Sequence, residues 1–292
     1  MSWMRILHPT NRRVRVLVGA LVAGLFCVQC TRSEAFRQSR FVVALSGVSF
    51  ADGASPEAAE IVRLAKTDHI ALLEYCLANY EGHYRDYTCT LIKQERIGGR
   101  VGQEQEIACQ FLESPYSVSM RWTPQTAGIG DRVLYVEGKY NDMMLVHPTG
   151  MLSKLVGSTV MRKPDSPQAM QSTLRPVNQF GFRKSLQSLL KVYRQARDGG
   201  DLKESFGGFA EVAGRRAVVL VRYLPPKDDY PAWKTLIFID LESLVPVAVE
   251  GYDWDKDLSS RYIFKDVRFN VGLTGDDFLP AAHGMKVPNS GG

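Results

Sequence analysis

The stretch Tyr116-Ser117-Val118-Ser119-Met120-Arg121-Trp122 alternates between two kinds of side chain along its whole length. Tyr116, Val118, Met120 and Trp122 fall on one face of an extended chain, and Ser117, Ser119 and Arg121 fall on the other. A period of two is typical of a β-strand with one buried face. The stretch therefore predicts a strand that needs an apolar partner on one side only.

Alternation of this kind recurs between residues 85 and 278 and predicts further strands. Pairs such as Gly98-Gly99 and Gly138-Lys139 separate neighbouring strands with residues that favour tight turns, so an antiparallel meander is expected. The further strands are predicted at 87–97, 103–112, 132–137, 141–147, 207–213, 217–223, 233–241, 245–254 and 259–270.

Two segments have the apolar spacing of helices. Residues 57–80 follow Ser55-Pro56, a cap and a first-turn proline, and Thr67-Asp68 marks a point where the helix can restart. Residues 182–197 carry Leu186, Leu189, Leu190, Tyr193 and Ala196 on one side. The sequence therefore predicts a mainly β protein with α-helices: one curved antiparallel sheet of about ten strands, with helices covering its concave face.

Residues 1–51 have the features of a leader. Arginines at 5, 12, 13 and 15 precede an uncharged apolar run, 16–28, which is shorter than the roughly 20 residues that span a bilayer. Two outcomes stay open: a signal peptide, with small residues around Ser49 and Ala51 for cleavage, or a retained membrane anchor. Either one predicts a periplasmic or otherwise extracytoplasmic location.

The remaining chain is expected to form a single domain, 52–280, followed by a flexible tail, 281–292. Residues 1–51 hold seven arginines and one acidic residue, which leaves 29 basic and 30 acidic residues in the rest of the chain. The excess of positive charge therefore belongs to the leader. A domain so close to neutral lacks the basic surface of a nucleic-acid-binding protein.

Several short motifs resemble those of an uncharacterised domain-of-unknown-function family of exported bacterial proteins. They are Asp86-Tyr87-Thr88-Cys89-Thr90, Lys93-Gln94-Glu95-Arg96-Ile97-Gly98-Gly99, Pro115-Tyr116-Ser117-Val118, Tyr135-Val136-Glu137-Gly138 and Gly181-Phe182. The C-terminal run from Phe238-Ile239-Asp240 through Phe264-Lys265-Asp266-Val267 is similar to the lipoprotein-carrier superfamily, which includes the outer-membrane lipoprotein-sorting proteins. This similarity implies an open half-barrel sheet with helical lids that holds acyl chains, and it brings no catalytic residue.

The residues themselves give little sign of catalysis or of a bound metal. Residues 52–292 contain neither a Gly-x-Ser-x-Gly motif nor a pair of histidines with metal-ligand spacing, so we expect no enzyme activity, cofactor or metal site. Asp142 and His147 could meet near a strand end, as the one candidate pair for a hydrolase. Cys89 and Cys109 are equally far from Gly99 and are predicted to face each other, either as a disulfide or as two buried thiols.

Two functions from different classes follow. The first is a non-enzymatic carrier or sensor that binds a lipid or a lipoprotein acyl chain on the concave face. The second is a structural or protein-interaction module of the cell envelope, with an envelope membrane protein as its partner and no small-molecule ligand. For the first, the predicted ligand-binding residues are Tyr116, Val118, Met120, Trp122, Val133 and Tyr135.

Overall fold

The computed structural model describes residues 39–45, 56–127, 130–149 and 159–287. Within these residues, thirteen strands form one antiparallel sheet that does not close into a barrel, as expected for a curved half-barrel. The strands are β1 (Val42–Leu45), β2 (Asp86–Ile97), β3 (Arg100–Val101), β4 (Gln105–Leu112), β5 (Ser117–Trp122), β6 (Gly130–Val136), β7 (Met144–Pro148), β8 (Val160–Arg162), β9 (Lys203–Val212), β10 (Arg215–Tyr223), β11 (Lys234–Asp240), β12 (Pro246–Tyr252) and β13 (Leu258–Phe269).

The strand order joins two meanders, one from each half of the chain. It runs β1-β9-β10-β11-β12-β13-β2-β4-β5-β6-β7-β8, and β3 pairs with β2 outside this path. The two meanders meet where β13 pairs with β2, with Tyr262 opposite Lys93 and Phe264 opposite Leu91. All ten strands predicted from alternation are present. The pairing of β13 with β2 was not predicted, because no local turn connects these strands.

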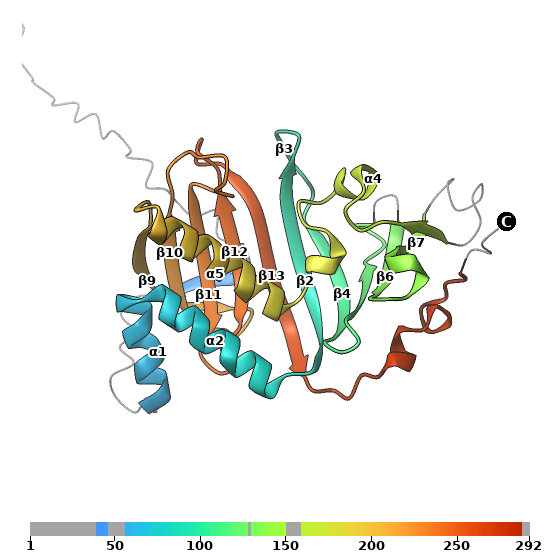
Figure 1. Ribbon diagram of the computed structural model, residues 1–292, viewed down its shortest axis with the longest axis horizontal. Coiled ribbons are helices and arrows are strands. Elements are labelled where there is room, and N and C mark those ends of the chain that lie inside the picture. Colours follow the sequence, from blue (N-terminus) through green and yellow to red (C-terminus); the bar gives the residue numbers. More distant parts are fainter. Residues whose placement is uncertain (1–38, 46–55, 128–129, 150–158, 288–292) are drawn as a thin grey trace, which may run out of the picture. The chain divides into compact units, whose positions relative to one another are not determined.

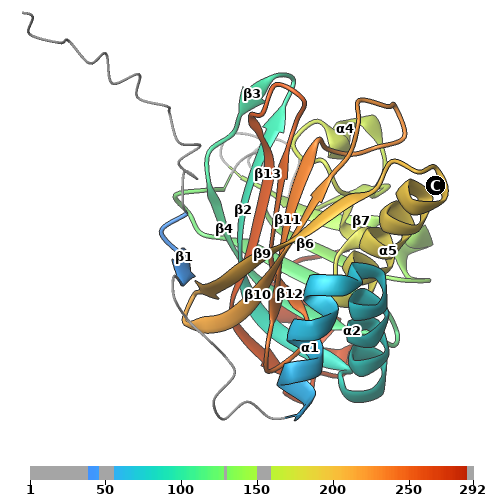
Figure 2. The ribbon, with the colours of Figure 1, turned by 90° about the vertical axis from the view of Figure 1, so that its left-hand side faces the viewer.

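The larger helices lie on one face of the sheet, here called the inner face (Figures 1 and 2). α1 (Pro56–Thr67), α2 (His69–His83) and α5 (Phe182–Asp198) lie over the strands of the C-terminal meander, and the short helix α4 (Pro167–Met170) lies over the other meander. The predicted restart at Thr67-Asp68 is confirmed. Asp68 caps α2 by accepting a hydrogen bond from the Ala71 N–H at 3.0 Å.

The start of α5 is fixed over the seam between the two meanders. Gly181 precedes it with a φ of 109°, and a Cβ atom there would lie 2.9 Å from the Phe111 ring, so the position requires glycine. The next residue, Phe182, is fully buried, with its ring 4.8 Å from that of Tyr87 and 4.7 Å from that of Phe264. These contacts join α5 to β2 and β13.

The opposite face of the sheet, here called the outer face, is partly covered by the C-terminal segment. The 3-10 helices η3 (Gly275–Phe278) and η4 (Pro280–His283) bring Phe278 and Met285 against Leu134 and Leu145 in a small buried cluster. Within the predicted flexible tail, His283 and Met285 are buried, and the other described residues up to 287 are exposed. Residues 288–292 lie outside the described part of the chain.

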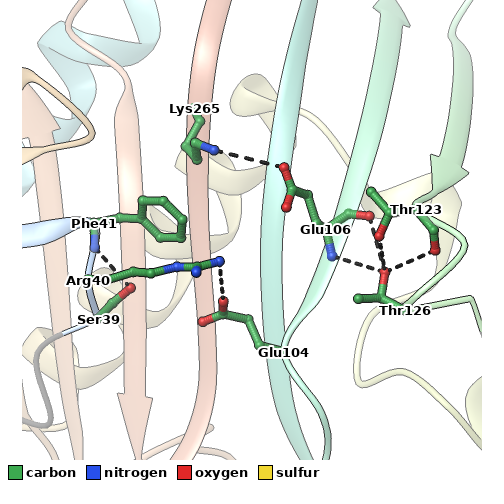
Figure 3. A network of polar contacts seen from close by, with 8 residues as sticks. All are labelled: Ser39, Arg40, Phe41, Glu104, Glu106, Thr123, Thr126 and Lys265. Carbon is green, nitrogen blue, oxygen red and sulfur yellow. Dashed lines mark hydrogen bonds and ion pairs between the residues drawn. The ribbon is translucent and has the colours of Figure 1, made fainter.

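The N-terminal edge of the sheet is β1, which lies inside the predicted leader and pairs with β9. Figure 3 shows the contacts around the residues just before it. The Phe41 ring lies 4.7 Å from the Arg40 guanidinium and 4.7 Å from the Lys265 ammonium group, and Arg40 reaches Glu104 at 3.5 Å. These contacts tie residues 39–45 to β13 and to the turn before β4.

Candidate functional site

A cavity of about 490 Å³ lies between the inner face of the sheet and the segment that includes α4 and the start of α5. Strand alternation explains its apolar wall, because every second residue of β2, β4, β5, β6, β7, β12 and β13 points inward. The volume falls within the roughly 300–1,000 Å³ of small-molecule sites. The large apolar residues that line it are Leu91, Ile107, Met120, Trp122, Val133, Met144, Val146, Val160, Val177, Phe180, Leu189, Val249 and Phe264.

Three of the six predicted ligand-binding residues line this cavity. Met120, Trp122 and Val133 contribute to its wall, and each is partly exposed. Met120 and Val133 are opposite each other in the pairing of β5 with β6. The Trp122 Nε1–H donates to Gln105 Oε1 at 3.2 Å, which holds the indole at the edge of the wall.

The other three predicted residues belong to the hydrophobic core. Tyr116, Val118 and Tyr135 are buried and do not line the cavity. The Tyr116 hydroxyl is directed at the covering segment, where the carbonyls of Val177 and Phe180 lie 3.1 and 2.8 Å away. Tyr116 therefore positions the cover of the cavity rather than its wall.

The cover consists of residues 164–181, which lie between the predicted strand 141–147 and the predicted helix 182–197. Ser166 caps α4, and η2 (Val177–Gln179) follows a short turn further along. Phe180 reaches from this segment into the core, with its ring 6.0 Å from that of Phe111. The sequence alone does not show that these residues form a wall, because their position depends on contacts with distant strands.

One end of the cavity is polar. Lys93 and Glu95 of β2 line it beside Tyr262 of β13, and their side chains are only 11% and 3% exposed. Lys93 Nζ lies 3.0 Å from Glu95 Oε2, a charge contact rather than an aligned hydrogen bond, because Oε2 has no hydrogen-bond partner. The ammonium group donates to Thr173 Oγ1 of the cover at 3.1 Å.

Tyr262 completes the polar end. Its hydroxyl donates to Glu95 Oε1 at 2.5 Å, and the guanidinium of Arg175, on the cover, lies 5.5 Å from its ring centre. Burial, and then the negative charge of Glu95, raise the pKa of Tyr262, so the hydroxyl keeps its proton at neutral pH. Sheet and cover therefore meet here through a charged cluster, while Met120, Val133 and Val146 make the neighbouring strands apolar.

The one pair considered for catalysis, Asp142 and His147, is not brought together. Asp142 Oδ1 accepts a hydrogen bond from the Gly138 N–H at 2.7 Å, whereas His147 Nδ1 contacts Asp131 at 2.8 Å.

Cys89 and Cys109 are opposite each other, as predicted, and both thiols are free and buried. Across the described residues, no three His, Cys, Asp or Glu side chains are grouped to hold a metal ion.

A second concavity, of about 610 Å³, lies on the outer face beside the C-terminal segment. His283 lines it, with Nδ1 3.0 Å from Ser119 Oγ and Nε2 2.8 Å from the Asp277 carbonyl oxygen. A carbonyl can only accept, so Nε2 carries the ring proton and Nδ1 accepts from Ser119. Burial lowers the pKa of His283, so the ring is neutral near pH 7 and holds the C-terminal segment against β5.

The chain is similar to several solved structures at low sequence identity. MucB matches with 13% identity over 73% of this chain and 63% of MucB, with a TM-score of 0.46, so less than two thirds of that protein is matched. A putative outer membrane lipoprotein-sorting protein domain from Vibrio parahaemolyticus matches with 14% identity over 73% of this chain and 97% of the domain, with a TM-score of 0.36. The Mycobacterium tuberculosis lipoprotein LppX matches with 11% identity over 70% of this chain and 96% of LppX, with a TM-score of 0.41.

The remaining findings concern the curated proteins, the helices of the chain and its family. No curated protein matches the sequence significantly. In the part of the chain that the structure describes, no helix is both long enough and apolar enough to cross a membrane. One family model matches residues 84–286, from the strand after α2 to the end of the packed C-terminal segment. The chain belongs to this family, DUF1571, which is described as a protein of unknown function.

Proposed function

We propose that this protein is an extracytoplasmic, non-enzymatic carrier or sensor whose single domain, 52–280, binds an acyl chain in the inner-face cavity. The observation that carries the proposal is the apolar wall of that cavity, built by Met120, Val133, Val146 and Phe264 and closed by the cover 164–181. Burial of methylene groups contributes about 0.8 kcal/mol each, so a chain of about 12 carbons gains on the order of 10 kcal/mol before ordering costs. An apolar cavity alone is therefore enough to hold a lipid.

The alternative is a structural or interaction module of the envelope that binds a membrane protein and no small molecule. Tyr116, Val118 and Tyr135 favour it, because this part of the inner face is filled by the protein's own core. Native mass spectrometry after gentle purification separates the two functions. Co-purified lipid supports the carrier, and a protein that carries none and takes up no acyl probe supports the module.

The substitution Met120→Glu tests the cavity directly. An unpaired carboxylate in an apolar wall costs several kcal/mol, so binding of a fluorescent fatty acid is expected to fall sharply. The matched control is Arg121→Glu, which adds a carboxylate at the adjacent position of the same strand but on the outer face. Arg121→Glu is expected to bind the probe like the unmodified protein.

Thermal unfolding of both variants completes the experiment. A folded Met120→Glu protein with unchanged probe affinity would reject this wall as the site. Loss of folding in Met120→Glu, with no probe binding by the unmodified protein, would favour the structural module.

A further inference from the structure

The cavity has an uneven distribution of charge. Its lining includes three cations, Lys93, Arg162 and Arg175, and one carboxylate, Glu95. Neither arginine forms an ion pair with a carboxylate of the described residues. The chain after residue 51 is close to neutral, so this excess of positive charge is a local property of the cavity.

Two of the cations lie together at the polar end. Strand pairing places Lys93 opposite Tyr262, and the Arg175 guanidinium lies over the Tyr262 ring. Arg162 is on β8, several strands away, opposite Met144 at the far edge of the sheet. Lys93 and Arg175 are therefore the pair able to reach one ligand group.

The hydrogen-bonding capacity of this pair is largely unused. An ammonium group has three N–H donors, and Lys93 aligns one of them with Thr173 while Glu95 provides a charge contact. Arg175 has five N–H donors in a planar fork, which matches the oxygens of a carboxylate or a phosphate. Glu95 offsets one positive charge, so the polar end has a net charge of about +1 when it is empty.

We infer that the ligand is an anionic amphiphile whose carboxylate or phosphate group binds Lys93 and Arg175 while its chain lies along Met120, Val133 and Val146. This inference rests on the proposed function and adds the class of head group. The Lys93 side chain is only 11% exposed, so its charge-assisted hydrogen bonds are stronger than in water. Met120, Val133 and Val146 offer the chain apolar contacts. A neutral amphiphile of equal length makes the apolar contacts with the wall but not the charge-assisted contacts of the head group.

The test compares three probes with the same chain: dodecanoate, dodecyl phosphate and dodecanol. Calorimetric titration of the full domain at neutral pH and low salt is expected to show that both anions bind at least about tenfold more tightly than the alcohol. The stronger of the two anions identifies the head group. Anions that bind no more tightly than dodecanol would overturn the inference and leave the proposed function intact, whereas failure of all three probes would reject both.

Arg175→Gln and Arg162→Gln form a matched pair of variants. Arg175→Gln is expected to weaken anion binding about tenfold and to leave dodecanol binding unchanged, because Arg175 is exposed and outside the core. Arg162→Gln removes the same charge from the far edge and is expected to change anion affinity less than threefold. An equal loss in both variants would overturn the assignment of the head group to Lys93 and Arg175.

Lys93 needs a different variant because Lys93→Met alone leaves Glu95 buried without its cation. The double variant Lys93→Met/Glu95→Gln removes both charges and keeps the hydrogen bond from Tyr262. The variant keeps Arg175 and a net charge of about +1, so the preference for anions is expected to weaken through the loss of the Lys93 donors, and the affinity for dodecanol is expected to stay the same. A folded double variant that prefers the anions by the same factor as the unmodified protein would overturn the role of Lys93.

Discussion

At the scale of single residues, His69 shows how a polar side chain is held between helices and sheet. It is 1% exposed, and its Nε2 lies 2.9 Å from the Ala65 carbonyl oxygen while its Nδ1 lies 3.1 Å from the Tyr193 hydroxyl. The carbonyl accepts from Nε2–H, which leaves Nδ1 to accept from Tyr193. His69 therefore links α1, α2 and α5 as a neutral ring.

This arrangement makes stability depend on pH. Burial lowers the pKa of His69 to about 4 from an ordinary value of 6.5. The unfolded chain binds a proton near pH 6.5 and the folded chain only near pH 4, so the stabilisation is complete above pH 6.5 and is lost as pH falls toward 4. The loss amounts to about 3 kcal/mol.

Urea unfolding at a series of pH values from 7.5 to about 4 measures this loss. The variant His69→Gln serves as the control, because an amide keeps hydrogen-bonding capacity and does not titrate in this range. Its free energy of unfolding is expected to vary less over the same interval. A pH dependence identical in both proteins would contradict the assignment to His69.

At the scale of elements, alternation predicts strands well when they are long. β5 and β13 were predicted because five or more positions repeat the pattern, whereas β1, β3 and β8 have only four, two and three residues. So few residues cannot establish a period. These short strands form through pairing with longer neighbours, and the sequence of each one contains little of that information.

The sequence predicted only part of the candidate site. The pattern of Tyr116 to Trp122 shows which face each side chain occupies, and Met120 and Trp122 do line the cavity. It does not show where the core ends and the cavity begins. That boundary depends on the cover 164–181, which the Tyr116 hydroxyl and the Phe180 ring hold in place through contacts distant in sequence.

β1 gives a prediction at this scale. Among the described strands it pairs with β9 alone, and the Phe41 carbonyl accepts a hydrogen bond from the Ala213 N–H at 2.8 Å. A chain that starts at residue 52 lacks β1, so hydrogen exchange at Ala213 is expected to be faster than in a chain that starts at residue 39. Its free energy of unfolding is expected to fall by about 2 kcal/mol, because the chain loses the burial of Val42.

Two point substitutions in the longer chain provide matched controls. Val42 is 6% exposed and Val43 is 52% exposed, although they are adjacent in the same strand. Val42→Ala is expected to lower the free energy of unfolding by about 1–2 kcal/mol, and Val43→Ala to leave it almost unchanged. Equal effects of the two substitutions would show that β1 does not pack in this register.

At the scale of the whole molecule, the predicted leader and the cavity support one proposed setting. The positive charge before the apolar run 16–28 favours export, and the proposed binding of acyl chains would serve where lipids must cross an aqueous space between membranes. Residues 1–38 of the predicted leader lie outside the described part of the chain. The position of any cleavage matters for the fold, because a chain that starts after Ala51 lacks β1.

We expect the protein to be exported and to lie outside the cytoplasm. The measurement is cell fractionation followed by amino-terminal sequencing of the protein from each fraction. A start after Ala51 would give a domain whose β9 edge is free to pair with another chain, because the pairing of β9 with β1 is lost. A start before residue 39 would keep β1 on that edge, and a retained leader would place the protein in the membrane fraction. An intact Met1 in the soluble cytoplasmic fraction would contradict export, and with it the proposal that the cavity receives its acyl ligand in the envelope.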